Sequence, residues 1–185
     1  MIYTDYTYFL NPFRYSQIEH YYNEPEPPFR EIVKKINTSS LPFGITASVT
    51  LSIAASFQQI YLRWIHPTAA IVCSYTALAY FWHQTCLSFQ IPPYKGKRAW
   101  LRLALSIISS AIHILLPVTW FPLVMFYPKT HEETLWWSPD EPGFYLYISG
   151  SIMEWIIFML NEIYVASFYT EFKLIQICKG EIVFL

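Results

Sequence analysis

Four long apolar stretches constrain this chain more than any other feature of its sequence. They cover residues 43–63, 69–91, 99–125 and 144–168. A hydrocarbon core of about 30 Å needs roughly 20 apolar residues in helical form, because every backbone polar group must be hydrogen-bonded inside it. The pattern predicts an all-α fold, a polytopic bundle of about four transmembrane helices. A helix buried in a large soluble domain is the alternative for any single stretch, and four stretches in 185 residues disfavour it.

Composition supports a membrane protein and argues against nucleic-acid binding. Only 14% of the residues are charged, against roughly 25% in a typical soluble domain. The formal net charge of −1 provides no basic field for a nucleic acid. The expected partners are therefore the lipid bilayer, membrane lipids and other membrane proteins, with no nucleic acid.

The distribution of charge predicts which side of the membrane each segment occupies. Cytoplasmic segments carry an excess of Lys and Arg. We therefore expect residues 1–42 to be a cytoplasmic polar segment with the remnant of a preceding span, residues 43–172 to be the bundle, and residues 173–185 to be a cytoplasmic tail. The loop 127–143 carries four acids against one lysine and belongs on the opposite side. The basic residues that support this orientation are Arg14, Arg30, Lys34, Lys35, Lys95, Lys97, Arg98, Arg102, Lys173 and Lys179.

Two further features concern the ends of the spans. Pro117 and Pro122 predict a kink or an end in the third span, because proline removes a backbone donor and clashes with the preceding turn. Aromatic rings near the span ends are typical of the belt that anchors helices at the headgroup region. Its expected members are Trp64, Trp100, Trp120, Trp136, Trp137 and Tyr169.

Two acids lie inside the fourth apolar stretch and need an explanation. A carboxylate near mid-span costs about 2.5 to 3.5 kcal/mol on insertion scales, so Glu154 and Glu162 are expected to face the bundle interior or a watery cavity. They are about 80° apart around a helix and about 12 Å apart along it, too far to share a proton directly. With Asn161, His83 and His113 they are expected to line a polar interior, which is either a proton or cation pathway, a lipid-headgroup site, or a set of interhelical hydrogen bonds that fix helix register. The last reading is the favoured one.

The sequence contains no soluble-type catalytic motif. His131-Glu132-Glu133 lacks the second histidine of a zinc-protease motif, and no nucleophile elbow, phosphate-binding loop or dinucleotide fingerprint occurs. A metal site from His83, His113 and Glu154 has suitable ligand chemistry but no supporting local spacing. We therefore expect no enzyme, no cofactor and no metal. A membrane-embedded lipid enzyme would need a catalytic group opposite Glu154, for which the sequence offers His113 or His83.

Two blocks of residues resemble a known family. The first contains Phe57-Gln58, His66 followed by Ala69 and Ala70, and Tyr80 with Gln84; the second contains Glu154-Trp155, Ser167-Phe168 and Glu171-Phe172. In these positions the chain resembles the DNA-damage-regulated autophagy modulator (DRAM) family of multi-span membrane proteins. Arg14 and Tyr15 match the Arg-Tyr pair at the cytoplasmic end of the family's second span. Family members have about six spans, and the resemblance covers their C-terminal four-span portion.

The resemblance implies a non-enzymatic regulator of autophagy, cell survival or membrane-lipid signalling, in lysosomal, endosomal or plasma membranes. The alternatives are a small transporter or ion and proton pathway that uses Glu154 and Glu162, and a membrane-embedded lipid enzyme. The family supplies no catalytic residues to carry over. The candidate functional or bundle-interior polar residues are Glu154, Trp155, Glu162, His66, Gln58, Gln84 and His113.

Overall fold

The computed structural model describes residues 11–20, 30–57, 64–91, 96–172, 175–178 and 181–184. Residues 11–20 are helical, and we call them the N-terminal helical segment. The elements that follow are α2 (Arg30–Ser56), α3 (Ile65–Gln90), α4 (Lys97–Phe126), α5 (His131–Leu135), α6 (Phe144–Ala166) and α7 (Tyr169–Phe172), with strands β1 (Ile175–Cys178) and β2 (Glu181–Phe184). The predicted all-α fold is confirmed, with a short antiparallel hairpin added at the C-terminal end.

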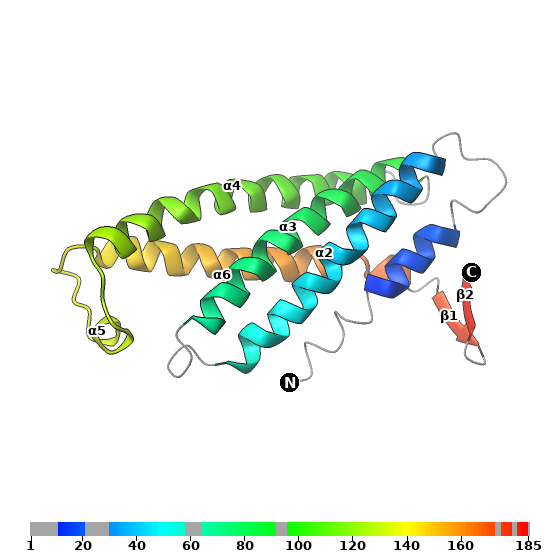
Figure 1. Cartoon of the computed structure of the whole chain (residues 1–185). Helices are drawn as coiled ribbons and strands as arrows, with labels where there is room; N and C mark the ends of the chain where they lie inside the picture. The colour runs from blue at the N-terminus through cyan, green and yellow to red at the C-terminus, as the bar shows by residue number, and fades with distance from the viewer. Residues whose placement is uncertain are drawn as a thin grey trace.

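The long helices form a bundle in which each packs against its neighbour in the chain or the next helix but one. In Figure 1, α2 and α3 run side by side, and α4 runs along α6. Helix α3 also packs against α4 and so joins the two pairs. Among the described residues, α2, α4 and α6 are long and apolar enough to cross a membrane. The predicted total of about four spans needs α3 as well, which has 26 residues and no Asp, Glu, Lys or Arg.

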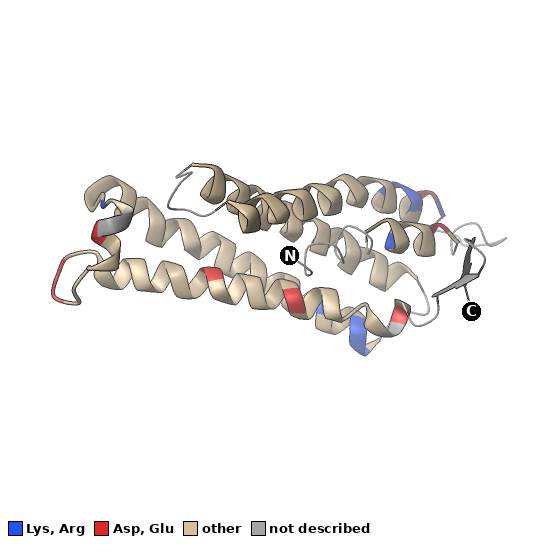
Figure 2. Cartoon of the chain, turned by 90° about the horizontal axis from the view of Figure 1, so that it is seen from below, with Lys and Arg blue, Asp and Glu red and all other residues tan. Residues whose placement is uncertain are grey.

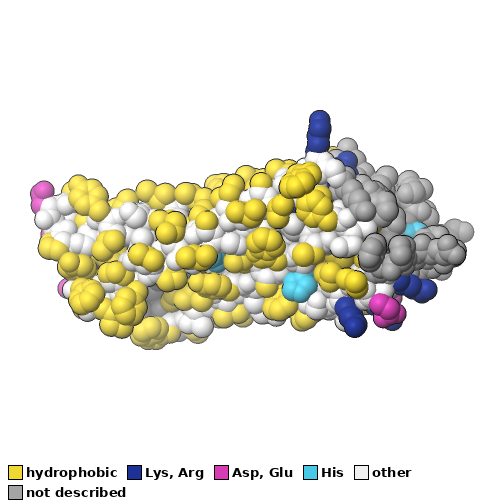
Figure 3. Space-filling model, turned by 90° about the horizontal axis from the view of Figure 1, so that it is seen from above, with side chains coloured by type: hydrophobic (Ala, Val, Ile, Leu, Met, Phe, Trp, Pro, Cys, Tyr) yellow, Lys and Arg dark blue, Asp and Glu magenta, His cyan; other side chains and the backbone are white. Residues whose placement is uncertain are grey.

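The outside of the bundle is apolar along most of its length. Figure 3 shows hydrophobic side chains over the middle of the molecule and charged ones near its two ends. Large side chains such as Ile114, Val118 and Phe121 expose 72%, 63% and 62% of their surface. A soluble monomer rarely exposes an apolar area this continuous. The chain is therefore an integral multi-pass membrane protein.

Basic residues are concentrated at one end of the bundle, and the loop at the other end is mostly acidic. Lys and Arg gather where α2 and α4 begin, and the connection from α4 to α6 is acidic (Figure 2). This arrangement agrees with the expected separation of basic and acidic segments. That both termini are cytoplasmic stays a prediction.

The structure adds detail to the predicted spans at helix α2, at the prolines of α4 and in the C-terminal segment. Helix α2 begins at Arg30, inside the segment expected to be polar and cytoplasmic, and it ends at Ser56. Helix α2 includes Pro42. The apolar stretch in the sequence does not reveal where this helix begins, because the first turns of the helix carry several charges. Helix α4 continues through Pro117 and Pro122 to Phe126, so neither proline ends it. The segment 173–185, which is expected to be a cytoplasmic tail, contains the hairpin of β1 and β2.

The expected aromatic belt is also only partly correct. Trp64, Trp100 and Trp136 expose 79%, 64% and 85% of their surface near helix ends, as an anchoring belt requires. Trp137 is 7% exposed and stacks on Tyr147 with ring centroids 5.5 Å apart. It forms the centre of the loop between α4 and α6 and faces the protein, not lipid.

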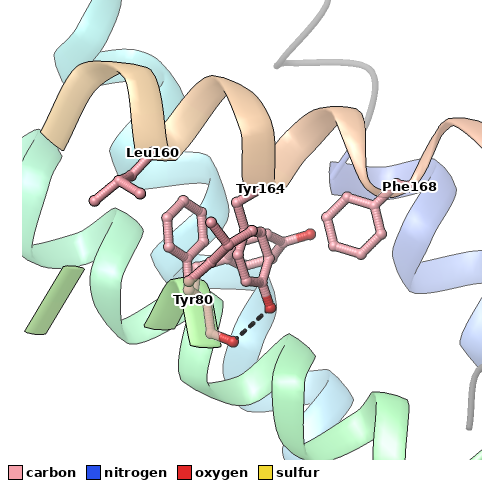
Figure 4. Packing of buried hydrophobic residues seen from close by; sticks show 6 residues of the cluster. Tyr80, Leu160, Tyr164 and Phe168 are labelled. Atoms are coloured by element: carbon pink, nitrogen blue, oxygen red, sulfur yellow. Dashed lines mark hydrogen bonds between the residues drawn. The ribbon is translucent and has the colours of Figure 1, made fainter. Parts of the chain in front are cut away.

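An aromatic core lies between α3 and α6. Tyr164 stacks on Phe81 with ring centroids 3.9 Å apart, and its hydroxyl donates to the Phe81 carbonyl at 2.8 Å (Figure 4). The other buried members of this cluster are Tyr80, Leu105, Leu160 and Phe168. Phe168 lies at the end of the core nearest the basic residues.

Candidate functional site

Three charged side chains meet inside the protein at its basic end. Arg14 comes from the N-terminal helical segment, Arg102 from the second turn of α4, and Glu171 from α7. Their relative exposures are 1%, 0% and 0%. We call these three residues the buried charged centre. Charged side chains are almost never fully buried unless they are paired, so a specific arrangement must compensate for their lost hydration.

Glu171 provides that compensation by using both of its oxygens. Arg14 Nη1 donates to Glu171 Oε2 at 2.6 Å, and Arg102 Nη2 donates to Glu171 Oε1 at 2.7 Å. The partners are 157 and 69 residues apart in the chain. One carboxylate therefore links residues from the beginning, the middle and the end of the chain by ion pairs.

Uncharged groups complete the shell around Arg102. Its Nε donates to Ser167 Oγ at 2.9 Å, its Nη1 to Ser88 Oγ at 2.7 Å, and its Nη2 also to the Ser167 carbonyl at 3.1 Å. The planar guanidinium presents several donors in fixed directions, and here all its nitrogens are used. A lysine at this position would not reach the same set.

The shell around Arg14 includes two glutamines. Arg14 Nε donates to Gln84 Oε1 at 3.0 Å, and Nη1 donates to Gln17 Oε1 at 2.9 Å. Gln17 in turn donates to the Glu171 carbonyl at 3.1 Å, and Gln84 donates to Ser40 Oγ at 3.2 Å. Through Gln84 the centre is connected to α3, and through Ser40 to α2.

An aromatic ring lies beside both cations. The Phe168 ring centroid is 4.2 Å from Arg102 Cζ and 4.9 Å from Arg14 Cζ. The negative face of a ring attracts a guanidinium, more strongly when water is excluded. Two arginines and one glutamate leave the centre with a formal charge of +1. What this arrangement can do chemically is to hold segments in place, because no part of it is open to a substrate.

Gln84 and His66 are the predicted residues with clear structural roles. Gln84 is 1% exposed and belongs to the shell around Arg14. His66, at the start of α3, has Nδ1 at 2.8 Å from the Ala54 carbonyl oxygen and 3.1 Å from that of Phe57. Both partners are acceptors, so Nδ1 carries a proton and the ring caps the end of α2. Gln58 lies outside the described residues.

Glu154 and Trp155 do not lie in the bundle interior as expected. Trp155 is 66% exposed, and Glu154 is exposed as well. The reason for Trp155 is geometric: it precedes the buried Ile157 by two residues, about 200° around the helix, and so points to the opposite face. Glu154 lies within electrostatic range of His66 and of the indole of Trp120.

The other histidines are not near Glu154. His113 is 3% exposed on α4, with Nδ1 2.8 Å from the Ser109 carbonyl and its ring edge-on to Tyr75. His83 has Nδ1 2.7 Å from the Ala79 carbonyl. The histidine that approaches Glu154 is therefore His66, and the pairing expected for an enzyme is not formed. In the described part of the chain, no three His, Cys, Asp or Glu residues are grouped to hold a metal.

Glu162 lies apart from the other predicted residues. It is partly buried and lines a pocket between α2, α3 and α6, together with Asn161. This position puts it on a different face of α6 from Tyr164. The two acids of α6 therefore do not share one polar interior.

Sequence reasoning does not predict the buried charged centre as a site. The charge pattern marks Arg14 and Arg102 only as residues of the cytoplasmic side, and Glu171 enters only as part of a family pattern. A signal is present in the sequence, since Arg102 lies between Leu101 and Leu103 inside a long apolar helix, where a charge needs a partner.

A family model matches most of the chain. Residues 6–175 match the model described as the Frag1/DRAM/Sfk1/Cwh43P N-terminal domain. This range contains the whole buried charged centre and all four long helices. No solved structure matches the chain.

Several curated proteins are similar to the chain. Human DNA damage-regulated autophagy modulator protein 2 is 30% identical over 132 residues, which are 69% of this chain and 49% of that protein. The modulator protein 1 of Xenopus laevis is 21% identical over 141 residues, covering 76% and 57%. The modulator of macroautophagy TMEM150B of Danio rerio is 33% identical over 66 residues, covering 36% and 28%. The chain spans about half the length of the curated relatives it matches first.

Proposed function

Because the chain belongs to the family of the Frag1/DRAM/Sfk1/Cwh43P N-terminal domain, we propose that it is a non-enzymatic regulator of autophagy in a lysosomal, endosomal or plasma membrane. Relatives named as autophagy modulators support the process. The observation that carries the proposal is the buried charged centre. Its charged groups are used on one another and are closed to any substrate, as expected of a structural element.

The proposed mode of action is recruitment through the basic end of the bundle. Around the buried charged centre, the basic side chains of Lys34, Lys35, Lys97 and Arg98 are exposed. Exposed cations at a membrane surface attract anionic lipids and acidic protein segments. The buried charged centre would keep the starts of α2 and α4 at a fixed separation, so that the exposed cations form one surface.

The test compares three forms of the protein in cells that lack it. Lysosome-dependent turnover of a long-lived cytosolic reporter is measured with and without an inhibitor of lysosomal acidification. We expect the wild-type chain to change turnover, the double variant Lys34→Glu/Lys35→Glu to fail with normal membrane abundance, and Glu154→Gln to behave as wild type. Turnover that is the same with and without the chain would contradict the proposal.

A small proton or ion pathway is the second candidate, and the proximity of Glu154 to His66 and Trp120 favours it over an enzyme. It is tested with the purified chain in vesicles that contain a pH-sensitive dye. A flux in the wild type that Glu154→Gln abolishes would support transport and count against the regulator. The regulator predicts no flux in either form.

A further inference from the structure

A pocket separates α6 from the α2 and α3 pair, next to the buried charged centre. Its volume is about 80 Å³, and it is open on one side. Helix α2 packs along α3, and α6 packs along α4, so the pocket lies where the two helix pairs do not fill the space between them. The N-terminal helical segment closes one end with Asn11.

The residues that line the pocket are spaced along each helix so that they lie on one of its faces. Helix α6 contributes Phe158, Asn161, Glu162 and Val165, which lie on one face because they are three, four and seven residues apart. This face differs from the one that buries Leu160 and Tyr164 against the aromatic core. Helix α6 therefore has a second face toward the protein that no side chain of the described residues fills.

Small residues on the facing helices produce the empty space. Gly44, Ala47 and Ser48 line the α2 wall, and Cys73 and Ala77 line the α3 wall. A side chain at position 44 is excluded, because a Cβ there would lie 2.8 Å from the Asn11 side chain. Asn11 in turn donates to Ser48 Oγ at 3.0 Å, so this wall is fixed by a hydrogen bond.

The polar residues of the α6 wall, Asn161 and Glu162, lie between apolar residues on both sides. Glu162 precedes the end of α6 at Ala166 by four residues, about 6 Å along the axis, and Phe158 lies about 6 Å deeper. Among the described residues, Glu162 has no ion-pair partner. A carboxyl group without an ion-pair partner among the described residues, in a mostly apolar wall, suits a ligand that has one polar head and a hydrocarbon chain.

The charges near the pocket determine which polar head group the ligand can carry. The pocket shares the Phe168 ring with the buried charged centre, whose formal charge is +1. A cationic head is opposed by the positive buried charged centre and an anionic head by the Glu162 carboxylate, which favours an uncharged head. A hydroxyl suits the carboxylate best, because hydrogen bonds to a charged acceptor are about twice as strong as those between neutral groups.

The volume of the pocket limits the hydrocarbon part of the ligand. An engineered cavity of about 150 Å³ holds one benzene ring, and this pocket is about half that volume. We propose that the pocket binds an uncharged single-chain amphiphile from the bilayer, with its hydroxyl at Glu162 and Asn161 and its hydrocarbon chain toward Phe158. This binding site is separate from the basic surface of the proposed function and does not depend on it.

The test uses three photoactivatable probes with the same hydrocarbon chain and different heads: a long-chain alkanol, an alkylamine and a fatty acid. The full chain in phosphatidylcholine nanodiscs is irradiated with each probe, and labelled peptides are identified by mass spectrometry. We expect the alkanol to label the pocket faces of α2 and α6 about tenfold more than the other probes, the discrimination of one charge-assisted hydrogen bond.

Variants identify the groups responsible. Glu162→Gln should lower alkanol labelling about tenfold, and Ala47→Trp, which fills the pocket, should abolish it. Glu154→Gln is the matched control, because it removes the other acid of the same helix outside the pocket, and it should change nothing. If a variant does not fold, competition of unlabelled alkanol against unlabelled alkylamine on the wild type gives the same answer. Equal labelling by the three probes, or labelling confined to the outer face of α6 around Trp155, would overturn the proposal.

Discussion

The two ends of the bundle use the same kind of ion pair in opposite surroundings. At the basic end, Glu171 joins Arg14 and Arg102 with almost no exposure to solvent. At the other end, Lys129 pairs with Glu141 in the loop between α4 and α6, with side-chain exposures of 23% and 45%. The buried partners are 157 and 69 residues apart, whereas the loop partners are 12 apart.

The loop is held mainly by packing and local hydrogen bonds. Lys129 Nζ lies 4.7 Å from the Trp137 ring centroid, and Trp137 stacks on Tyr147. Thr130 and Glu133 form a capping box at the start of α5. Exposed ion pairs in proteins contribute about 0 to 1 kcal/mol, whereas breaking a buried one costs about 3 to 5 kcal/mol. Charge therefore determines the fold at one end of the bundle, and packing determines it at the other.

Glu171→Gln should have the largest effect on stability. It leaves two buried guanidinium groups without their carboxylate, and we expect a loss of about 3 to 5 kcal/mol in the free energy of unfolding. The measurement is equilibrium unfolding in mixed micelles, followed by tryptophan fluorescence. Glu154→Gln is the control and should lose far less, because Glu154 is exposed. Equal losses would mean that the centre has no special role.

Arg102→Lys should have the next largest effect. The lysine retains the charge but loses several of the donors that reach Ser88, Ser167 and Glu171. We expect a loss of about 2 kcal/mol in the same unfolding measurement. A stability equal to that of the wild type would show that charge alone, without the guanidinium geometry, is sufficient at this end.

Gly143→Ala tests the packing of the loop. Gly143 has φ +87°, and a Cβ there would lie 2.8 Å from Trp137 Cζ2 and 2.9 Å from Tyr127 Cγ. We expect a loss of about 1 to 2 kcal/mol or more. Gly96→Ala is the matched control, because Gly96 has φ +98° with nothing within 4 Å of its Cβ position. The difference between the two variants measures the clash, and no difference would contradict the packing account.

Glu141→Gln should have the smallest effect, and its effect should depend on pH. Hydrogen bonds from Lys129 and from the Ser138 backbone lower the pKa of Glu141 below 4.5. A lowered carboxyl pKa stabilises the loop above pH 4.5, and this contribution disappears as the pH falls through the pKa of the folded protein. Proteolysis of the loop in the wild type should therefore be the same at neutral pH and at about pH 5, and faster at about pH 3.

The variant provides the control for this pH dependence. With Glu141→Gln, the loop should be cleaved slightly faster than in the wild type at neutral pH, and the difference should vanish at about pH 3. A difference that persists or grows in acid would mean that another group is responsible.

Much of the fold could be predicted from the sequence because lipid imposes a simple rule on long apolar stretches. The all-α bundle and the DRAM resemblance are confirmed. Helix α2 begins earlier than predicted, because the prediction started the span where the apolar residues begin, whereas the helix itself continues through the charged residues before them.

The site was harder to predict for a physical reason. Arg14, Arg102 and Glu171 are far apart in the chain, and although Arg102 lies inside an apolar stretch, the sequence does not show which residues pair with it. Their pairing depends on how the helices pack against one another, which cannot be predicted from the periodicity of the sequence. Glu154 stands out in the sequence because it lies within an apolar stretch, yet the structure leaves it exposed beside His66.

The central claim is that the buried charged centre holds the N-terminal helical segment onto the bundle. Backbone hydrogen–deuterium exchange in nanodiscs tests it directly, by comparing residues 11–20 with the loop 127–143 in the wild type and in Glu171→Gln. We predict that the variant loses protection at residues 11–20 and keeps wild-type exchange in the loop. Unchanged protection at residues 11–20, or an equal loss in both regions, would contradict the claim.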